Sequence, residues 1–289
     1  MTNNFNGFIT INKTSGMTSN RINHSVKRIF NVDKCGFIGT LDPFAEGVLP
    51  VAIGHATKLI YYIEDSLKEY IAEITWGAET DTYDLTGNIV NKTIYIPKLY
   101  EIEKILPEFI GDIEQTPPIY SAIKINGKRA CDMVRKGIDV RIKSRIVHIN
   151  KIEILSHNDK STYIKVNCNK GVYIRSLAVD IAKRLGTLAY LSFLQRTLSY
   201  KFNINKSVTI EKLLKINKND VQYYLQPMDF VLDDIPALTV QSTYKFFNGM
   251  FEGCESDDSD LVKVYCDADF IGLGKVSNGF LYPVRVFKD

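Results

Sequence analysis

The sequence predicts an α+β fold: a mixed, largely antiparallel central sheet with flanking helices, followed by a small β-rich C-terminal unit. Short segments alternate apolar and polar residues, as half-buried strands do, and other stretches repeat apolar residues every three or four positions, as amphipathic helices do. The two kinds do not follow one another in regular β-α-β order, which argues against a parallel sheet. Composition also changes near residue 230, and 289 residues suffice for two domains of about 150 residues each.

The first 87 residues predict two strands and two helical stretches around a glycine-rich connection. A short strand is expected at residues 9–11. A helix beginning at Thr18 or Ser19 follows, because its apolar residues recur at helical spacing: Ile22, Val26 and Ile29. The stretch GFIGTLDPFAEG (36–47), the apolar run VLPVAIG (48–54) and a helical stretch at 57–63 come next. Residues 70–76 alternate as a strand does, and ETDTYDLTG (79–87), dense in Asp, Thr and Gly, is expected to be a loop.

The remaining elements follow the same reasoning. Apolar residues at helical spacing over 102–109 predict a helix that the double proline 117–118 ends. Residues 163–168 predict a strand, which is expected to resume after Gly171 and to place Tyr173 and Arg175 on one face. A helix then runs from Leu177 to its cap at Gly186. Three short strands are predicted near the end, at LVKVYC (261–266), FIGLGKV (270–276) and FLYPVRVF (280–287).

Composition excludes several classes of protein. A hydrophobic fraction of 45% and a charged fraction of 24% rule out wholesale disorder, and no apolar run approaches the roughly 20 residues that span a bilayer. The start MTNNFNGFITINK lacks the features of a secretory signal, so none is expected. Five scattered cysteines without a C-x-x-C pair, and four histidines without H-E-x-x-H spacing, predict no disulfide scaffold and no metal site. We therefore expect a cytoplasmic protein in a reducing compartment, with a monomer as the default state.

The positive charge is concentrated in one segment. Residues 124–151 contain nine basic and two acidic residues, a net charge of +7, whereas the whole chain carries only +3. Such a patch favours a polyanionic partner, with nucleic acid first among the candidates, although a solvated lysine-rich face is the alternative.

One acidic residue lies in a loop suited to chemistry. Asp42 follows Gly39 and precedes Gly47, and Pro43 stiffens the loop beside it. Glycines allow a close backbone approach to a ligand, and a carboxylate held there can act as a nucleophile or a general base. An ordinary Asp-Pro turn is the alternative.

The same stretch closely resembles the G-x-x-G-T-L-D-P-x-A-x-G-V-L-P loop of the bacterial tRNA pseudouridine synthase B family. Five further segments are similar to family motifs: KTSGMTS (13–19, with Thr14 for proline), Lys68-x-Tyr70, ETDTYDLTG, PPIYSAIKINGKRACDMVRKG (117–137, with Cys131 for an aromatic residue) and NKGVYIRSLAVDIAKRLG (169–186). The resemblance covers residues 7 to about 200 well and the C-terminal part loosely.

The resemblance implies the pseudouridine synthase fold and an enzyme that isomerises uridine to pseudouridine at position 55, in the TΨC loop of tRNA, without a cofactor or metal. It assigns the nucleophile to Asp42 and expects Arg175 to pair with it and keep it ionised. Tyr70 is expected to lie against the uracil, positioned for proton transfer, and Tyr173 to form part of the aromatic wall. The target base must leave its stack to reach the loop.

Two further site residues carry open alternatives. Lys13 is expected either to support the active-site loop or to bind a phosphate. Phe37 stands where the family commonly has histidine, and it is expected to act as an uncharged wedge against an unpaired base, with packing into the core as the alternative.

The implied organisation has two parts. Residues 1–230 form the catalytic domain, with a basic thumb-like insertion at about 120–151 that clamps the TΨC stem-loop through the phosphate contacts of Lys124, Lys128 and Arg129. Residues 231–289 form an RNA-binding appendage resembling the PUA module. A non-catalytic RNA chaperone is the main alternative, and the set Asp42, Tyr70 and Arg175 argues for catalysis. A guide-RNA-dependent relative is disfavoured by the basic insertion and the lack of long Lys-rich tails.

Overall fold

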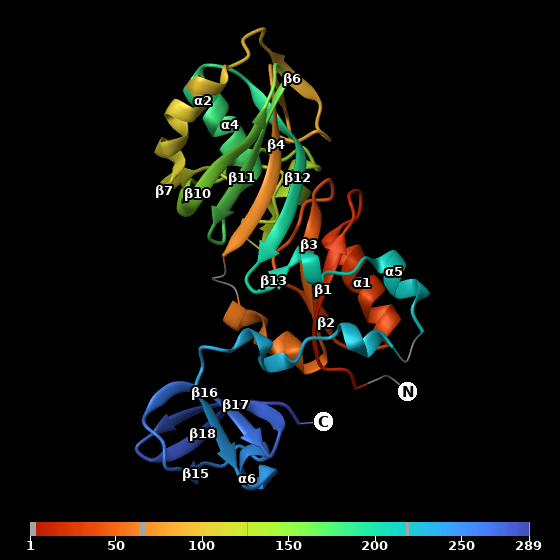
Figure 1. The fold of residues 1–289 in the computed structure, drawn as a ribbon, viewed down its shortest axis with the longest axis vertical. Coiled ribbons are helices and arrows are strands. Elements are labelled where there is room, and N and C mark those ends of the chain that lie inside the picture. The colour runs from red at the N-terminus through yellow and green to blue at the C-terminus, as the bar shows by residue number, and fades with distance from the viewer. Residues whose placement is uncertain (1–3, 64–66, 126, 218–219, 289) are drawn as a thin grey trace.

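The computed structural model describes residues 4–63, 67–125, 127–217 and 220–288. Within them, nine strands form one central sheet in the order β1-β3-β12-β4-β11-β10-β7, with β2 added to β3 and β13 to β12 (Figure 1). All neighbouring strands are antiparallel except β3 and β12, which are parallel. The predicted mixed, largely antiparallel sheet is therefore confirmed. Its strands are β1 Gly7–Lys13, β2 Cys35–Phe37, β3 Glu46–Ile53, β4 Lys68–Trp76, β7 Gly111–Gln115, β10 Arg145–His157, β11 Ser161–Cys168, β12 Ala189–Ser199 and β13 Phe202–Asn203.

Helices cover one face of this sheet. Helix α1 (Ser19–Phe30) packs against β2, β3 and α5 (Ile210–Lys215). Helix α4 (Ile174–Leu185) packs against β4, β12 and α2 (Leu99–Ile105). Apolar residues of both groups join a single core cluster. The helix expected at 57–63 is a 3-10 helix, η1 (Gly54–Ile63).

Helix α1 begins as predicted. Thr18 is its N-cap and its side chain accepts a hydrogen bond from the backbone N–H of Arg21, while Ile22 and Val26 are buried. The cap supplies an acceptor for an otherwise unpaired N–H in the first turn. The helix therefore starts at the last residue of the KTSGMTS segment and fixes where that segment lies.

Two predictions of secondary structure are wrong. The double proline 117–118 does not end a helix: α2 stops at Ile105, a 3-10 turn at Leu106–Phe109 contains Pro107, and β7 follows before the prolines. A proline at position 107 has no N–H for the next helical hydrogen bond, so the helix ends earlier.

The strand after Gly171 is the second error. Tyr173 is the N-cap of α4, and Arg175 lies in its first turn, so the two do not share a strand face. The apolar residues Ile174, Leu177 and Ile181 already follow the helical period, and they begin the helix three residues earlier than expected. The cap at Gly186, with φ 72°, is confirmed.

Two short hairpins project from the sheet. One joins β5 (Ala78–Thr80) to β6 (Ile89–Lys92) and contains the ETDTYDLTG loop. The other joins β8 (Lys124–Ile125) to β9 (Lys128–Arg129) and leads into α3 (Ala130–Val134). The basic segment 124–151 therefore has two parts, because its last seven residues belong to β10 and lie in the central sheet.

The C-terminal unit is a separate five-stranded sheet in the order β14-β16-β17-β18-β15 with one short helix, α6 (Thr243–Phe247). Its strands are β14 Ala237–Val240, β15 Glu252–Gly253, β16 Ser259–Cys266, β17 Asp269–Ser277 and β18 Phe280–Val286. Figure 1 places it at the end of the molecule opposite α2 and α4. A second core cluster joins Leu273 and Phe287 of this unit to Phe8, Val48 and the 3-10 helix η1, on the other face of β1 and β3.

Candidate active site

Asp42 lies in the loop between β2 and β3, and side chains of the KTSGMTS segment hold this loop by hydrogen bonds to its backbone. The Lys13 ammonium donates to the carbonyl oxygens of Met17 at 2.8 Å, Pro43 at 3.1 Å and Thr14 at 3.2 Å. Lys13 is fully buried, and its burial lowers the pKa of the ammonium to about 8 against the opposing charges of Asp42 and Glu46. All three ammonium donors are thus used within the protein. Of the two roles open for Lys13, support of the loop fits, and binding of a substrate phosphate does not.

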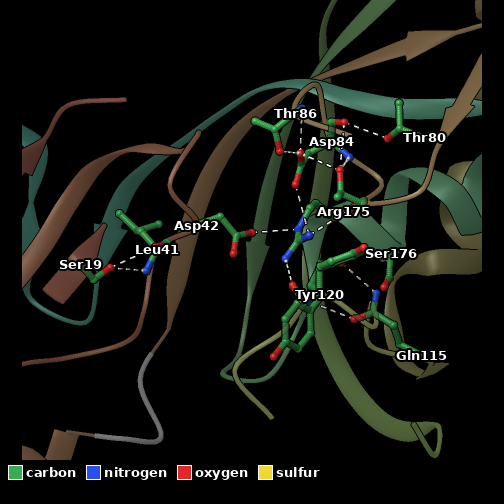
Figure 2. A network of polar contacts seen from close by, with 12 residues as sticks. Ser19, Leu41, Asp42, Thr80, Asp84, Thr86, Gln115, Tyr120, Arg175 and Ser176 are labelled. Atoms are coloured by element: carbon green, nitrogen blue, oxygen red, sulfur yellow. Dashed lines mark hydrogen bonds and ion pairs between the residues drawn. The ribbon is translucent and has the colours of Figure 1, made fainter. Parts of the chain in front are cut away.

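Two serines complete the brace. The Ser19 hydroxyl donates to the carbonyl oxygen of Leu41 and accepts from its N–H, both at 3.0 Å (Figure 2). The Ser15 hydroxyl donates to the carbonyl oxygen of Phe44 at 2.7 Å. The backbone on both sides of Asp42 is therefore fixed by the segment that leads into α1.

Arg196 holds the other side of the loop. This residue of β12 is 1% exposed, and its guanidinium donates to the carbonyl oxygens of Val48 at 2.8 Å and Gly39 at 2.9 Å. Gly47 has φ 97°, and a Cβ there would clash with the Arg196 carbonyl oxygen, so only glycine fits. The sequence analysis missed Arg196. Its only signal in the sequence is a charged residue that follows the apolar residues Leu191 and Leu194 in the same strand.

Asp42 forms an ion pair with Arg175, and Asp84 holds Arg175 from the opposite side. The Arg175 Nε lies 2.9 Å from Oδ2 of Asp42, and Nη1 lies 3.2 Å from Oδ2 of Asp84 (Figure 2). The guanidinium also donates to the carbonyl oxygens of Thr82 and Tyr120, both at 2.9 Å. Arg175 is 3% exposed, so its orientation is set by these four partners.

Asp84 is itself fixed by its loop. Its Oδ1 accepts from the Thr82 hydroxyl at 2.9 Å, the Thr86 N–H at 3.0 Å and the Thr86 hydroxyl at 2.5 Å. The ETDTYDLTG loop thus fixes the Asp84 carboxylate through Oδ1 and leaves Oδ2 to pair with Arg175. The sequence marks this loop as a motif but assigns Asp84 no role, because only the fold shows that the loop meets Arg175 of α4.

The Asp42 carboxyl differs from the others in its environment. Its side chain is 30% exposed, whereas that of Asp84 is 5% exposed. Burial, and secondarily the negative charge of Asp84, raise the pKa of Asp42, while the charges of Arg175 and Lys13 oppose the shift. The pairing of Asp42 with Arg175 is as expected. Its effect is to limit a rise in the pKa of Asp42 rather than to lower it below the ordinary value.

Asp42 and Arg175 open onto a pocket of about 240 Å³. Tyr70 of β4 lines this pocket and is 8% exposed, and burial raises the pKa of its phenol, so the hydroxyl keeps its proton at neutral pH. Tyr173 lines the pocket from the start of α4. The structure therefore brings Asp42, Tyr70, Arg175 and Tyr173 to one cavity.

Gln115 positions Tyr173, and sequence reasoning missed it. Its side chain is 1% exposed and spans the Tyr173 backbone, accepting from the N–H at 2.8 Å and donating to the carbonyl oxygen at 3.2 Å. A buried glutamine at the end of β7 gives no recognisable pattern in the sequence, because its partner lies 58 residues away.

Phe37 lies elsewhere. It is in β2, pairs with Val51 and packs half-buried against the main core cluster, and it is not among the residues that line the pocket. This arrangement fits the packing alternative rather than a wedge against a base.

Lys124, Lys128 and Arg129 are exposed on the β8–β9 hairpin. They are available to a polyanion but do not line the active-site pocket. The hairpin connects to the pocket through Tyr120, whose carbonyl oxygen is held by Arg175 (Figure 2).

The part of the chain that the structure describes offers no candidate metal centre, because it contains no group of three or more His, Cys, Asp or Glu side chains placed to hold an ion. No helix in residues 4–63, 67–125, 127–217 or 220–288 has the length and apolar character needed to cross a membrane.

Comparison with known proteins shows the family. Residues 27–174 match the family described as TruB family pseudouridylate synthase (N terminal domain), and residues 175–233 match the tRNA pseudouridylate synthase B C-terminal domain. The chain is 39% identical to tRNA pseudouridine synthase B of Francisella philomiragia over 98% of this chain and 95% of the relative. It is 41% identical to the protein of the same name from Clostridioides difficile over 94% and 95%.

Solved structures agree on the fold. The chain resembles the structure titled "Crystal Structure of a Cbf5-Nop10-Gar1 Complex" with a TM-score of 0.69 and 25% identity, covering 98% of this chain and 84% of that one. It resembles an H/ACA RNP bound to a substrate RNA, also with a TM-score of 0.69, at 23% identity over 98% and 85%. Together with the pocket that joins Asp42, Tyr70 and Arg175, these matches confirm the resemblance, and the chain belongs to the tRNA pseudouridine synthase B family of pseudouridine synthases.

Proposed function

We propose that this enzyme isomerises uridine 55 in the TΨC loop of tRNA, with Asp42 as the nucleophile. Family membership supports isomerisation of a tRNA uridine to pseudouridine. The single observation that carries the choice of Asp42 is its position: a partly exposed carboxylate at a pocket of about 240 Å³, paired at 2.9 Å with an arginine that is otherwise buried.

Asp42 has the geometry of a nucleophile rather than of a structural carboxylate. Oδ1 of Asp84 accepts hydrogen bonds from three donors of its own loop. Asp42 instead pairs with Arg175 through Oδ2 and faces the pocket. Because the loop is fixed on both sides by Ser19 and Arg196, the carboxylate can be aimed at the substrate without reordering the backbone.

Arg175 and Tyr70 complete the reaction site. Isomerisation breaks the N-glycosidic bond, turns the uracil and forms a bond from C5 to C1′, so no electrons are gained or lost. Arg175 keeps Asp42 ionised and oriented until it attacks, and the carboxylate is released again before the product leaves. One proton is lost from C5 and one is gained by N1, and the protonated Tyr70 hydroxyl lies at the pocket for this proton transfer.

The size of the pocket implies base flipping. Asp42 and Tyr70 lie at a confined pocket of about 240 Å³ that a stack of bases cannot enter, so the target uridine leaves its stack to reach them. Tyr173 then forms an aromatic wall for the flipped base. The exposed β8–β9 hairpin clamps the TΨC stem-loop through phosphate contacts. A monomer suffices for the reaction, because one chain brings Asp42, Tyr70, Arg175 and Tyr173 to the pocket.

The test is carbodiimide-based mapping of pseudouridine on an unmodified tRNA transcript incubated with the protein alone. We expect one new reverse-transcription stop, at uridine 55. A stop at another uridine would contradict the assignment of the position. Binding of the transcript without any stop would instead favour the alternative of a non-catalytic RNA chaperone.

A further inference from the structure

Arg145 lies where the basic segment enters the central sheet. It is the first residue of β10, and its backbone pairs with Gln115 at the end of β7. The preceding residues Lys143 and Ser144 are exposed, and Arg145 is exposed as well. Its backbone is therefore fixed by the sheet, while its side chain reaches the wall of the active-site pocket.

The Arg145 guanidinium is already ordered at that wall. Its centre lies 5.5 Å from the centroid of the Tyr173 ring, and its Nη2 donates to the carbonyl oxygen of Gly171 at 2.6 Å. The guanidinium also packs against Gly171, since a Cβ at this glycine would lie 3.4 Å from Nη2. An ordered guanidinium loses less conformational freedom on binding than a free side chain does.

Arg145 differs from the two other arginines of the pocket. Arg175 and Arg196 are 3% and 1% exposed, and carboxylates or carbonyl oxygens occupy their guanidinium groups. Arg145 is exposed, its guanidinium donates through Nη2, and no ion pair joins it to a carboxylate among the described residues. It is therefore a charged donor on the pocket wall whose remaining N–H groups can serve a ligand.

We infer that Arg145 binds a phosphate that flanks the target nucleotide, and thereby holds the flipped base between the phosphate anchor and the Tyr173 wall. The inference rests on the proposed function. A nucleotide turned into the pocket carries its two backbone phosphates to the pocket mouth, and an arginine fork matches phosphate oxygens in charge and geometry.

The position of Arg145 gives it a task distinct from that of the hairpin lysines. Lys124 and Lys128 are exposed outside the pocket and can hold phosphates of the stem. Arg145 shares the pocket with Asp42, so its phosphate contact exists only when the target nucleotide has left the stack. Removing the guanidinium should therefore slow single turnover at saturating enzyme, beyond any reduction in affinity.

The experiment is a double-mutant cycle on synthetic TΨC stem-loops. Arg145→Gln and the wild type are each assayed in single turnover on an all-phosphate RNA and on RNAs with one neutral methylphosphonate, placed 5′ or 3′ of the target uridine. We expect Arg145→Gln to slow the all-phosphate reaction by about tenfold to hundredfold. One of the two methylphosphonates should slow the wild type by a similar factor and the variant by less than about threefold. Arg145→Lys, which keeps the charge without the fork, should recover part of the rate.

Arg28→Gln, a change of an exposed arginine on α1, is the matched control and should keep the wild-type rate on every RNA. Fully multiplicative effects of Arg145→Gln and both methylphosphonates would overturn the inference, since Arg145 would then act by supporting Tyr173 and Gly171. An unchanged rate for Arg145→Gln would overturn it too. A wild type that binds but does not convert the unmodified stem-loop would overturn the proposed function itself, and the inference with it.

Discussion

At the scale of single residues, the site contains three charged side chains, Asp42, Arg175 and Asp84, and the proposed mechanism uses Asp42 as the reacting group. Arg175 lies between two carboxylates, and their other contacts distinguish them. Asp84 accepts from three donors of its own loop as well as from Arg175, whereas Asp42 pairs with Arg175 and faces the pocket. Because one guanidinium faces two carboxylates, burial and the charge of Asp84 leave the pKa of Asp42 above its ordinary value of 3.8.

This arrangement predicts the pH dependence of the reaction. In the proposed mechanism the ionised form of Asp42 reacts, so the single-turnover rate should fall with decreasing pH, with a midpoint above 3.8, because the pKa of Asp42 is raised. Asp84→Asn removes a negative charge that raises this pKa, so the acid limb should move to lower pH. Asp81→Asn, in the same loop, is the control and should leave the limb in place. A limb that moves to higher pH in Asp84→Asn would contradict the charge balance.

Phe37 allows a second test at this scale. Since it packs half-buried against the core and away from the pocket, Phe37→Ala should lower the free energy of unfolding by about 1–2 kcal/mol, less than for a fully buried phenylalanine. Denaturant unfolding measures this, and single turnover on a TΨC stem-loop should stay close to that of the wild type. A slower reaction and weaker binding at unchanged stability would restore the wedge against an unpaired base.

At the scale of elements, the KTSGMTS segment and the loop that carries Asp42 form one unit. The side chains of Lys13, Ser15 and Ser19 each donate a hydrogen bond to the backbone of residues 41–44. Lys13 also donates to Thr14 and Met17 within the segment itself. The contacts with residues 41–44 join residues that lie 22 to 30 positions apart, so the sequence showed the two motifs but not their contact.

Periodicity in the sequence was sufficient to predict β4 and β11, whose buried sides alternate as expected. It was insufficient at residues 172–176, where a few residues satisfy strand and helix alike.

Ser19→Ala tests the coupling within this unit. The change leaves the N–H and the carbonyl oxygen of Leu41 without their buried partner, which should cost about 1–3 kcal/mol of unfolding free energy. The loop that carries Asp42 should also lose order, so single turnover slows while RNA affinity is kept. Ser25→Ala, on the same helix, serves as the control. Equal effects of the two serines on turnover would show that the loop does not depend on Ser19.

The β8–β9 hairpin predicts a dependence on salt. Replacing Lys124, Lys128 and Arg129 with alanine should weaken RNA binding and reduce the slope of log affinity against log salt by up to about 0.9 for each phosphate that the variant no longer neutralises. Filter binding at several salt concentrations measures the slope. The control replaces three exposed cations elsewhere: Lys27, Arg28 and Lys104. The same slope in the hairpin variant and the wild type would make the hairpin a solvated face and not a clamp.

At the scale of the whole molecule, positive and negative charge are concentrated in different segments of the chain. The segment 124–151 carries a net charge of +7, whereas residues 231–289 carry ten acidic and five basic residues, a net charge of −5. The C-terminal unit joins the body through an apolar cluster on the sheet face opposite the helices. The sequence predicted the existence of this unit from its strands. Its docking on η1, β1 and β3 depends on long-range packing that no local pattern encodes. The same limit explains Arg196 and Gln115, whose partners lie far away in the chain.

The central claim is that Asp42 reacts with a tRNA uridine brought into the pocket, and Asp42→Asn tests it most directly. Asparagine has nearly the same shape and cannot serve as the nucleophile. The proposed phosphate contacts, which we expect to supply most of the RNA affinity, do not involve Asp42. The measurement is carbodiimide mapping of uridine 55 after single turnover, with tRNA binding followed in parallel. We predict no conversion above a no-enzyme control, with binding retained. Measurable conversion by Asp42→Asn would remove Asp42 from the nucleophile's role and contradict the proposed mechanism.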